Sequence, residues 1–320
     1  MECGVPQGSC LGPLLFTLFI NDLPNALTTT NITLYTDDST PFQAADSASV
    51  VSINPQNDLS NVEKWVLKNR MVLNVGKTKS ILIGSRKKVN VAQPLNLRMN
   101  NKSINQHSCV KLLGVEVDDT LSWKPHCEKL LKDCSKCLGL LYRFKKYIPP
   151  KVLKLIAEAL ILSKLNYCCT VWGAVLNQDS INYLQKLQNK VARLILNYKV
   201  KEISRRDLHS EIGWLTVRQR IYHQTLMMLH KSLYTHEPST IYMYLHVLEI
   251  LHEHNTRFST KCRKDKLLLK KPKFKKKIFL ARAFRVRAIE IWNNLNSETK
   301  SIASKSRFKS AFRKQLSWFI

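Results

Sequence analysis

The sequence predicts an α+β domain followed by an all-α region, and three observations support this. First, a long apolar run precedes two short strand-like runs within the first 45 residues. Second, further short strands continue to residue 118, bounded by Gly, Asn and Lys-rich turns. Third, helical spacing of apolar residues begins after Trp123. We therefore expect an antiparallel sheet with helices in residues 1–118, a helical region in 119–200 and a basic helical region in 201–320.

The first elements are a helix and a hairpin. The apolar run from Ser9 to Leu27 predicts a buried helix, which other parts of the protein must cover. Ile32–Tyr35 and Ser39–Gln43 are typical of short strands. Adjacent aspartates favour turns, so Asp37 and Asp38 are expected at the tip of a hairpin between these strands.

The remainder of the α+β domain is expected to be one helix and several strands. Apolar residues at helical spacing predict a helix over residues 58–73, with Asp58 or Ser60 as its N-cap. The strands should pair in an antiparallel manner. They are expected in residues 77–84, 94–99 and 110–117.

After Trp123, helical stripes are separated by Pro149–Pro150 and by residues 173–179. Further helices are expected at 214–234, near 278–295 and at 305–319.

The chain contains nine cysteines and no signal peptide, so we expect an intracellular protein, nuclear or cytoplasmic and not secreted, without disulfides. Cys127, Cys134 and Cys137 share one helical stripe, which favours small buried residues over zinc ligands. The longest apolar stretches are too short to cross a membrane.

The charge is high and unevenly distributed. Lys and Arg number 51 against 23 Asp and Glu, a net charge of +28 that favours a nucleic-acid partner, although a solvated lysine-rich surface would give the same composition. Residues 1–63 contain no Lys or Arg but seven carboxylates, a pattern that suggests a metal site beside a basic surface. The tract Lys261–Lys277, with Arg282, Arg285 and Arg287, is expected to bind nucleic acid with a steep salt dependence.

Two motifs carry specific chemistry. Glycines flank Pro-Gln in the segment 4–9, GVPQGS, which predicts a rigid turn that lets a base pair approach the backbone; an ordinary glycine-rich helix cap explains the segment equally well. In Tyr35-Thr36-Asp37-Asp38, two adjacent carboxylates can present hard oxygen ligands to Mg²⁺. A plain surface turn is the alternative for this second motif.

Together, the order and spacing of these motifs resemble those of non-LTR (LINE-type) retrotransposon reverse transcriptases. GVPQGSCLGPLLFTLFINDLP resembles their motif B, LYTDDST motif C, NVGKTKSILIG motif D and KLLGVEVDDTLSW the primer-grip motif E. LNYCCTVWG and AFRVRAIEIWNNL resemble the thumb and downstream region. The resemblance implies a partial reverse-transcriptase palm in 1–118, a thumb-like region in 119–200 and a basic C-terminal region in 201–320.

The resemblance also implies roles for individual residues. Asp37 would be the principal metal ligand and Asp38 a supporting one. Lys77, in competition with Lys79, would stabilise or protonate the departing pyrophosphate. The remaining implied residues would bind substrate, either beneath the nascent base pair or at the primer end. These are Gly4, Pro6, Gln7, Gly8, Tyr35, Leu113 and Gly114.

The implied parent activity is RNA-directed DNA polymerisation, with Mg²⁺ as cofactor and an RNA template, a DNA primer and dNTPs as partners. Two departures stand out. Thr36 occupies a position that is usually small in motif C. Motif A, which supplies the aspartate that bridges both metals in this family, is expected upstream of motif B, so the chain is expected to be inactive by itself. The alternatives are a non-catalytic nucleic-acid-binding protein, or an orphaned fragment that does not fold stably.

Overall fold

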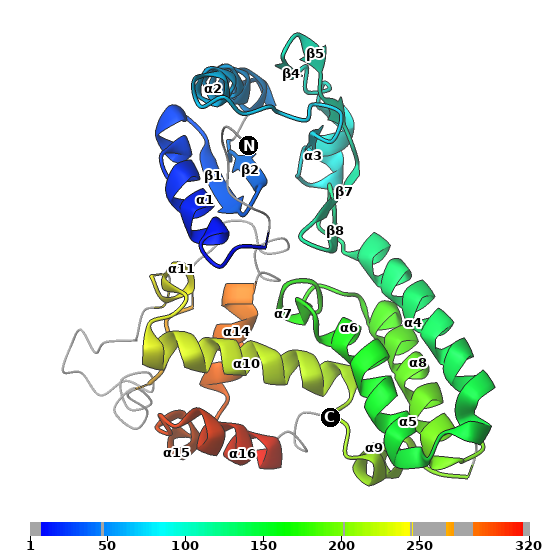
Figure 1. Cartoon of the computed structure of the whole chain (residues 1–320). Helices are drawn as coiled ribbons and strands as arrows, with labels where there is room; N and C mark the ends of the chain where they lie inside the picture. Colours follow the sequence, from blue (N-terminus) through cyan, green and yellow to red (C-terminus); the bar gives the residue numbers. More distant parts are fainter. Residues whose placement is uncertain are drawn as a thin grey trace, which may run out of the picture. The chain divides into compact units, whose positions relative to one another are not determined.

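Figure 1 shows the computed structural model of the chain, which describes residues 8–45, 48–200, 202–243, 245, 267–271 and 284–315. The chain forms two compact units, unit 1 (residues 1–121) and unit 2 (residues 122–320). Unit 1 mixes helices with small sheets, whereas unit 2 is built mainly from helices. The predicted change from α+β to helical structure is therefore present along the chain.

Unit 1 begins with helix α1 (Gly12–Ile20) and the 3₁₀ turn η1 (Leu23–Ala26), which together replace the single helix predicted over residues 9–27. Pro13 sits in the first turn of α1, where its missing N–H costs nothing. The expectation of burial is wrong for most of this helix: Ile20 is buried, but Leu14 is 57% exposed and Leu18 is 65% exposed. An apolar face of α1 therefore lies open on unit 1.

The predicted hairpin is present. Strands β1 (Asn31–Tyr35) and β2 (Asp38–Phe42) pair antiparallel, with a register that ends at the Tyr35–Asp38 pair. Ile32 and Leu34 on alternate positions of β1 pack into a small core formed by α1, η1 and the next helix. The buried members of that core are Ile20, Leu23, Val62 and Val66.

Helix α2 (Ala48–Lys68) begins earlier than the helix predicted over residues 58–73 and contains Pro55. The proposed N-caps Asp58 and Ser60 are therefore wrong, because both residues lie inside the helix. Sequence alone favoured a cap there because an aspartate before an apolar run is a common helix start. In the structure, Asp58 is instead directed at a neighbouring segment of the chain.

Short strands complete unit 1. Two antiparallel pairs join β4 (Arg98–Met99) to β5 (Lys102–Ser103) and β7 (Cys109–Leu112) to β8 (Val115–Asp118). The expectation of antiparallel pairing throughout is wrong for β3 (Lys79–Ser80), which pairs parallel with β6 (Asn105–Gln106). Helix α3 (Arg86–Val91) was not predicted. A second small core joins α2 to these strands through Leu59, Leu95, Leu97, Met99 and Ile104.

In the first part of unit 2, helices α4 and α8 pack against each other and against shorter helical pieces. Cys127 and Cys134 on α4 are buried, as the helical stripe predicted, and Cys137 is half-buried. Burial raises the pKa of the Cys134 thiol to about 11, so this thiol stays protonated at neutral pH and is unreactive. The elements are α4 (Lys124–Phe144), η2 (Lys145–Tyr147), α5 (Pro150–Ala157), a π-helical turn (Glu158–Leu162), α6 (Ser163–Asn166), α7 (Cys169–Trp172) and α8 (Gln178–Leu196).

The second part of unit 2 is organised around α10 (Val217–Thr235), which packs against both α14 and α16 (Figure 1). Leu226, Leu229, Trp292, Phe308 and Phe312 form the centre of this core. No helix in the described part of the chain is long and apolar enough to cross a membrane. The other elements here are α9 (Arg205–Ile212), α11 (Ser239–Tyr242), α14 (Phe284–Asn293), α15 (Ser297–Lys300) and α16 (Lys305–Gln315).

Candidate active site

The hairpin tip carries the strongest candidate site. Thr36 and Asp37 form the turn between Tyr35 and Asp38, and both carboxylates are exposed. Thr36 has a left-handed φ of 50°, which costs free energy for a β-branched residue. Tyr35 is 62% exposed at the same end of the hairpin. Two carboxylates and a phenol are thus presented on a strained turn, as expected of a site that receives a ligand.

The base of this hairpin is held by Asp58, which is 1% exposed. One carboxylate oxygen of Asp58 accepts hydrogen bonds from the Thr28 amide at 2.9 Å and the Thr28 hydroxyl at 2.8 Å. The other oxygen accepts from the Thr29 amide and hydroxyl and from the Thr30 amide, at 3.0, 2.8 and 2.7 Å. Although burial alone would raise the pKa of Asp58, the hydrogen bonds from Thr28 and Thr29 hold it well below its ordinary value.

The contact of Asp58 with residues 28–30 was not predicted from the sequence. The only available signal was the run Thr28-Thr29-Thr30 directly before β1, because hydroxyls followed by free amides can surround a carboxylate. Nothing in that run specifies which carboxylate fills the position. The contact joins the middle of α2 to the start of β1, so it fixes the strand that leads to Tyr35, Asp37 and Asp38.

Lys77 is exposed and follows a tight turn closed by its own amide, which donates to the carbonyl oxygen of Asn74 at 3.1 Å. In the described part of the chain, no hydrogen bond or ion pair joins Lys77 to Asp37 or Asp38. Lys79 is also exposed, at the start of β3. The structure therefore does not bring either lysine into contact with the carboxylates.

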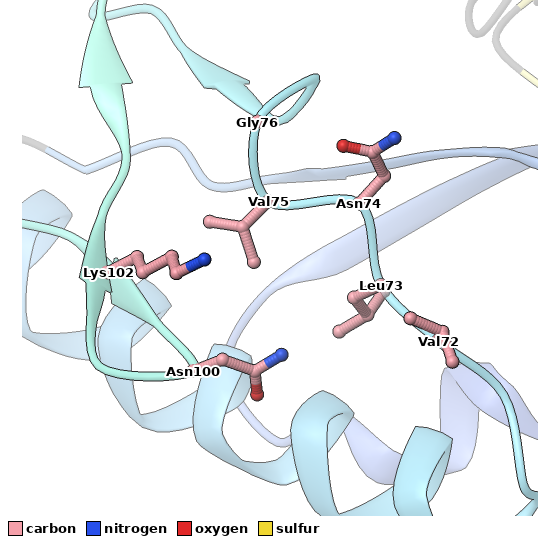
Figure 2. A pocket seen from close by; sticks show the side chains of 7 residues that line it. All are labelled: Val72, Leu73, Asn74, Val75, Gly76, Asn100 and Lys102. Carbon is pink, nitrogen blue, oxygen red and sulfur yellow. The ribbon is translucent and has the colours of Figure 1, made fainter.

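A hollow of about 450 Å³ lies beside this turn (Figure 2). Val72, Leu73 and Val75 give it aliphatic walls. The side chain of Lys102 extends from β5 toward the segment 72–76, and Asn100 lies beside it. An ammonium group and an amide over an aliphatic wall could accept a small anionic or polar group next to Lys77.

The primer-grip candidates lie in the turn of the β7–β8 hairpin. Leu113 and Gly114 both have left-handed φ values, of 44° and 85°, between the paired residues Leu112 and Val115. Glycine suits this conformation, whereas leucine is strained by it. Leu112 and Leu113 are also partly open to solvent. This turn therefore presents apolar side chains outward on a strained backbone.

The motif B candidates Gly4, Pro6 and Gln7 lie outside the described residues. Gly8 is described: it is exposed and has a φ of +81°, a conformation that glycine adopts without strain. The amide of Gly12, the first residue of α1, donates to the Ser9 hydroxyl at 3.0 Å.

The donor set of the hairpin fits Mg²⁺. This ion takes one or two protein carboxylates and fills its remaining positions with waters and substrate phosphates. Asp37 and Asp38 are exposed oxygen donors of this kind. Within the described residues, no group of three or more His, Cys, Asp and Glu side chains gathers at a single place that could hold a metal. The hairpin thus supplies part of a metal site.

Comparison with known proteins agrees with the motifs. Residues 1–117 match the family model described as reverse transcriptase (RNA-dependent DNA polymerase). This N-terminal segment is therefore similar to the reverse transcriptase family. Between 61% and 70% of the chain is similar to RNA-directed DNA polymerases of non-LTR retrotransposons at modest identity, so the resemblance predicted from the motifs is confirmed.

Three relatives illustrate the match. The chain is 27% identical over 223 residues to the Retrovirus-related Pol polyprotein from type-1 retrotransposable element R1 of Bradysia coprophila, covering 66% of the chain and 22% of the relative. It is 26% identical over 237 residues to the probable RNA-directed DNA polymerase from transposon BS of Drosophila melanogaster, covering 70% and 26%. It is 25% identical over 206 residues to the RNA-directed DNA polymerase from mobile element jockey of Drosophila funebris, covering 61% and 22%.

The chain therefore spans only 22% to 26% of the length of these relatives. No solved structure matches it.

Proposed function

We propose that this chain carries one part of the active site of an RNA-directed DNA polymerase that uses two Mg²⁺ ions. The observation that carries the proposal is the exposed pair Asp37 and Asp38 on a strained hairpin turn, within a segment that matches the reverse transcriptase family. When bound, the two ions would stabilise the attacking and leaving oxygens of nucleotidyl transfer. RNA template, DNA primer and dNTP are the proposed partners of the complete enzyme.

Each candidate residue has a role in this proposal. Asp37 would hold the metal directly and Asp38 would support it. Tyr35, on the same hairpin, contacts the primer end, as do Leu113 and Gly114 on the strained β7–β8 turn. Lys77 reaches the departing pyrophosphate once substrate has closed the site. Gly4, Pro6, Gln7 and Gly8 form a side-chain-poor floor beneath the nascent base pair.

We further propose that the 320-residue chain does not extend primers by itself. Phosphoryl-transfer catalysis depends on positioning, and metals held by carboxylates from one turn only would be poorly fixed. The apolar face of α1 supports a larger polymerase domain, because Leu14 and Leu18 on that face have no cover within the described part of unit 1. On this view residues 1–118 are part of a palm, 119–200 are thumb-like and 201–320 form the basic region of an intracellular protein.

The test is primer extension on an RNA template with Mg²⁺, using two matched proteins. One is the 320-residue chain, and the other is the same chain joined to the preceding polymerase region of a relative such as the R1 element protein. We expect no extension by the first protein and extension by the second. Extension by the chain alone, lost in Asp37→Ala, would show that another carboxylate such as Asp22 completes the site.

A second candidate function is nucleic-acid binding without catalysis, and one observation favours it. Residues 122–320 hold most of the 51 Lys and Arg residues, so the positive field belongs to unit 2 and not to the hairpin. Such binding would persist in Asp37→Ala and weaken steeply with salt. The proposed tract Lys261–Lys277 and Arg282 lie largely outside the described residues. Arg287 forms an ion pair with Glu290, with 3.8 Å between a guanidinium nitrogen and a carboxylate oxygen.

A further inference from the structure

Three cations follow one line along α16. Lys305, Lys309 and Arg313 recur at every fourth position, so they stand above one another on the same side of the helix. All three are exposed, and no carboxylate forms an ion pair with them in the described part of the chain. We call these three residues the α16 cationic line. Neither α16 nor α10 contains Asp or Glu, so neither helix supplies a counter-charge.

The α16 cationic line runs beside α10. Burial together with the nearby Arg313, Lys309 and Arg220 lowers the pKa of His223 on α10 to about 4. Lys305 acts on His230, seven positions further along α10, in the same direction. The positive charges of two helices therefore meet along one edge of unit 2.

Polar atoms on α10 also lack partners at this edge. His223 is 7% exposed, and its Nε2 atom has no hydrogen-bond partner. The Nε atom of Arg220 is buried and likewise unpartnered, although another guanidinium nitrogen of Arg220 donates to the Asn166 side chain at 3.1 Å. One unpartnered donor, Arg220 Nε, and the exposed cations of α16 therefore lie along the same edge of unit 2, where positive groups favour an anion.

The arrangement costs stability in the free protein. Like charges four positions apart on a helix repel each other, which destabilises the helix. The helix is nevertheless fixed in place because Phe308 and Phe312 are fully buried. A bound anion would offset the repulsion without moving the helix.

The burial of Phe308 and Phe312 also indicates which kind of anion this surface can bind. A helix that inserts at a membrane surface needs a free apolar face. Phe308 and Phe312 are committed to the core, where Phe308 stacks on His230 at a ring distance of 4.1 Å. The outward side of α16 carries only cations and small polar residues such as Ser306 and Ser310. A nucleic-acid backbone needs cations alone, so it fits this surface better than a lipid bilayer does.

We propose that the α16 cationic line, together with Arg220 of α10, binds the phosphate backbone of nucleic acid. The proposal rests on the nucleic-acid binding proposed above and places part of it on a folded helical edge, separate from the tract Lys261–Lys277. Because the contacts are to phosphates, they should not distinguish base sequences.

The test uses the full chain and fluorescence anisotropy with a labelled RNA oligonucleotide at several salt concentrations. The variant Lys309→Gln/Arg313→Gln removes two charges from the line. The matched control Arg205→Gln/Arg206→Gln removes two exposed cations from the first turn of α9. We expect the line variant to bind about tenfold more weakly and to lose roughly 1.4–1.8 from its salt slope, with a much smaller change in the control.

Equal weakening in both variants would overturn this inference while leaving general nucleic-acid binding intact. No binding by the wild-type chain at low salt would overturn the proposed binding function as well. The same variants would also be tested for binding to phosphatidylserine vesicles. If Lys309→Gln/Arg313→Gln weakens binding to the vesicles more than binding to RNA, the α16 cationic line contacts a membrane surface and the proposal is rejected. If Lys309→Gln/Arg313→Gln fails to fold by circular dichroism, Lys305→Gln/Lys309→Gln replaces it, with the same expected result.

Discussion

Asp58 and Thr28 are joined by two hydrogen bonds to a single carboxylate oxygen, from the Thr28 amide at 2.9 Å and the Thr28 hydroxyl at 2.8 Å. With the three further bonds from Thr29 and Thr30, they tie the middle of α2 to the start of β1. The hairpin that presents Asp37 therefore depends on a buried charge in a distant helix.

Asp58→Asn should lower the free energy of unfolding of unit 1 by about 3 kcal/mol. The asparagine side chain has one oxygen that can accept hydrogen bonds, whereas its NH₂ group is itself a donor and would face the donor groups of Thr28 to Thr30. Amide hydrogen exchange in β1 would measure the loss. The control Asp22→Asn changes an exposed carboxylate and should leave exchange unchanged. Equal exchange in Asp58→Asn and the wild type would show that Asp58 does not hold the hairpin.

The same contact predicts a pH dependence. The pKa of Asp58 is lowered in the folded chain, so its stabilisation is present above the ordinary value of 3.8 and is lost as the pH falls below it. Urea unfolding of the wild type should therefore show stability that decreases below about pH 4. Asp58→Asn should show a flatter profile in this range, and a profile parallel to the wild type would contradict the assignment.

Thr36 is the strained residue of the β1–β2 hairpin, with a φ of 50°. Thr36→Gly should raise the stability of unit 1 by about 0.5–1 kcal/mol, because glycine adopts this conformation freely. The matched control Thr33→Gly, in the middle of β1, should lower stability, because glycine weakens a strand interior. Thermal unfolding followed by circular dichroism would measure both. A loss of stability in Thr36→Gly would mean that its side chain makes a compensating contact.

The open apolar face of α1 predicts self-association of the isolated chain. Leu14→Gln/Leu18→Gln should reduce both oligomer formation and binding of a hydrophobic dye, with little change in stability, since both side chains are largely exposed. Leu67→Gln, an exposed substitution on α2, is the control. Sedimentation velocity would measure oligomer formation. Unchanged oligomer formation in Leu14→Gln/Leu18→Gln would show that this face of α1 does not mediate self-association.

His223 predicts a second pH effect, in unit 2. Burial, together with the positive charges of Arg313 and Lys309 from α16 and of Arg220 from α10, lowers its pKa from 6.5 to about 4. The folded state thus resists protonation, so stability is complete above pH 6.5 and is lost as the pH falls toward 4. The loss attributable to His223 is at most about 3 kcal/mol.

His223→Leu should remove this part of the pH dependence, and urea titrations at a series of pH values would measure it. His209 and His230 also have lowered pKa values because of burial, so some dependence should remain in the variant. The control His107→Gln lies in unit 1 and should leave the unit 2 transition unchanged. A slope in His223→Leu identical to that of the wild type would exclude His223 as its source.

Local chemistry explains which features the sequence could predict. The Asp37–Asp38 turn follows from residues adjacent in the chain, and its hairpin is present. Helical spacing also predicted α10, whose capping box pairs Thr216 with Gln219. These elements depend on interactions within a few residues, which a sequence pattern records.

Long-range contacts explain the rest. The role of Asp58 depends on Thr28, which lies 30 residues away, so the aspartate was taken for a helix cap. Strand β3 is two residues long and pairs parallel with β6, a partner that no local pattern specifies. The exposure of α1 could not be predicted from the sequence either, because an apolar run has the same pattern whether or not the segment that covers it is present.

The proposed role of Asp37 as a ligand of catalytic metal is tested in the chain joined to the preceding polymerase region of a relative. Single-nucleotide incorporation on an RNA template would be measured across Mg²⁺ concentrations. Asp37→Ala should abolish incorporation at every concentration, whereas Asp22→Ala and Thr36→Ala should remain active. Incorporation by Asp37→Ala at the wild-type rate would contradict the account, because the hairpin would then contribute no essential metal ligand.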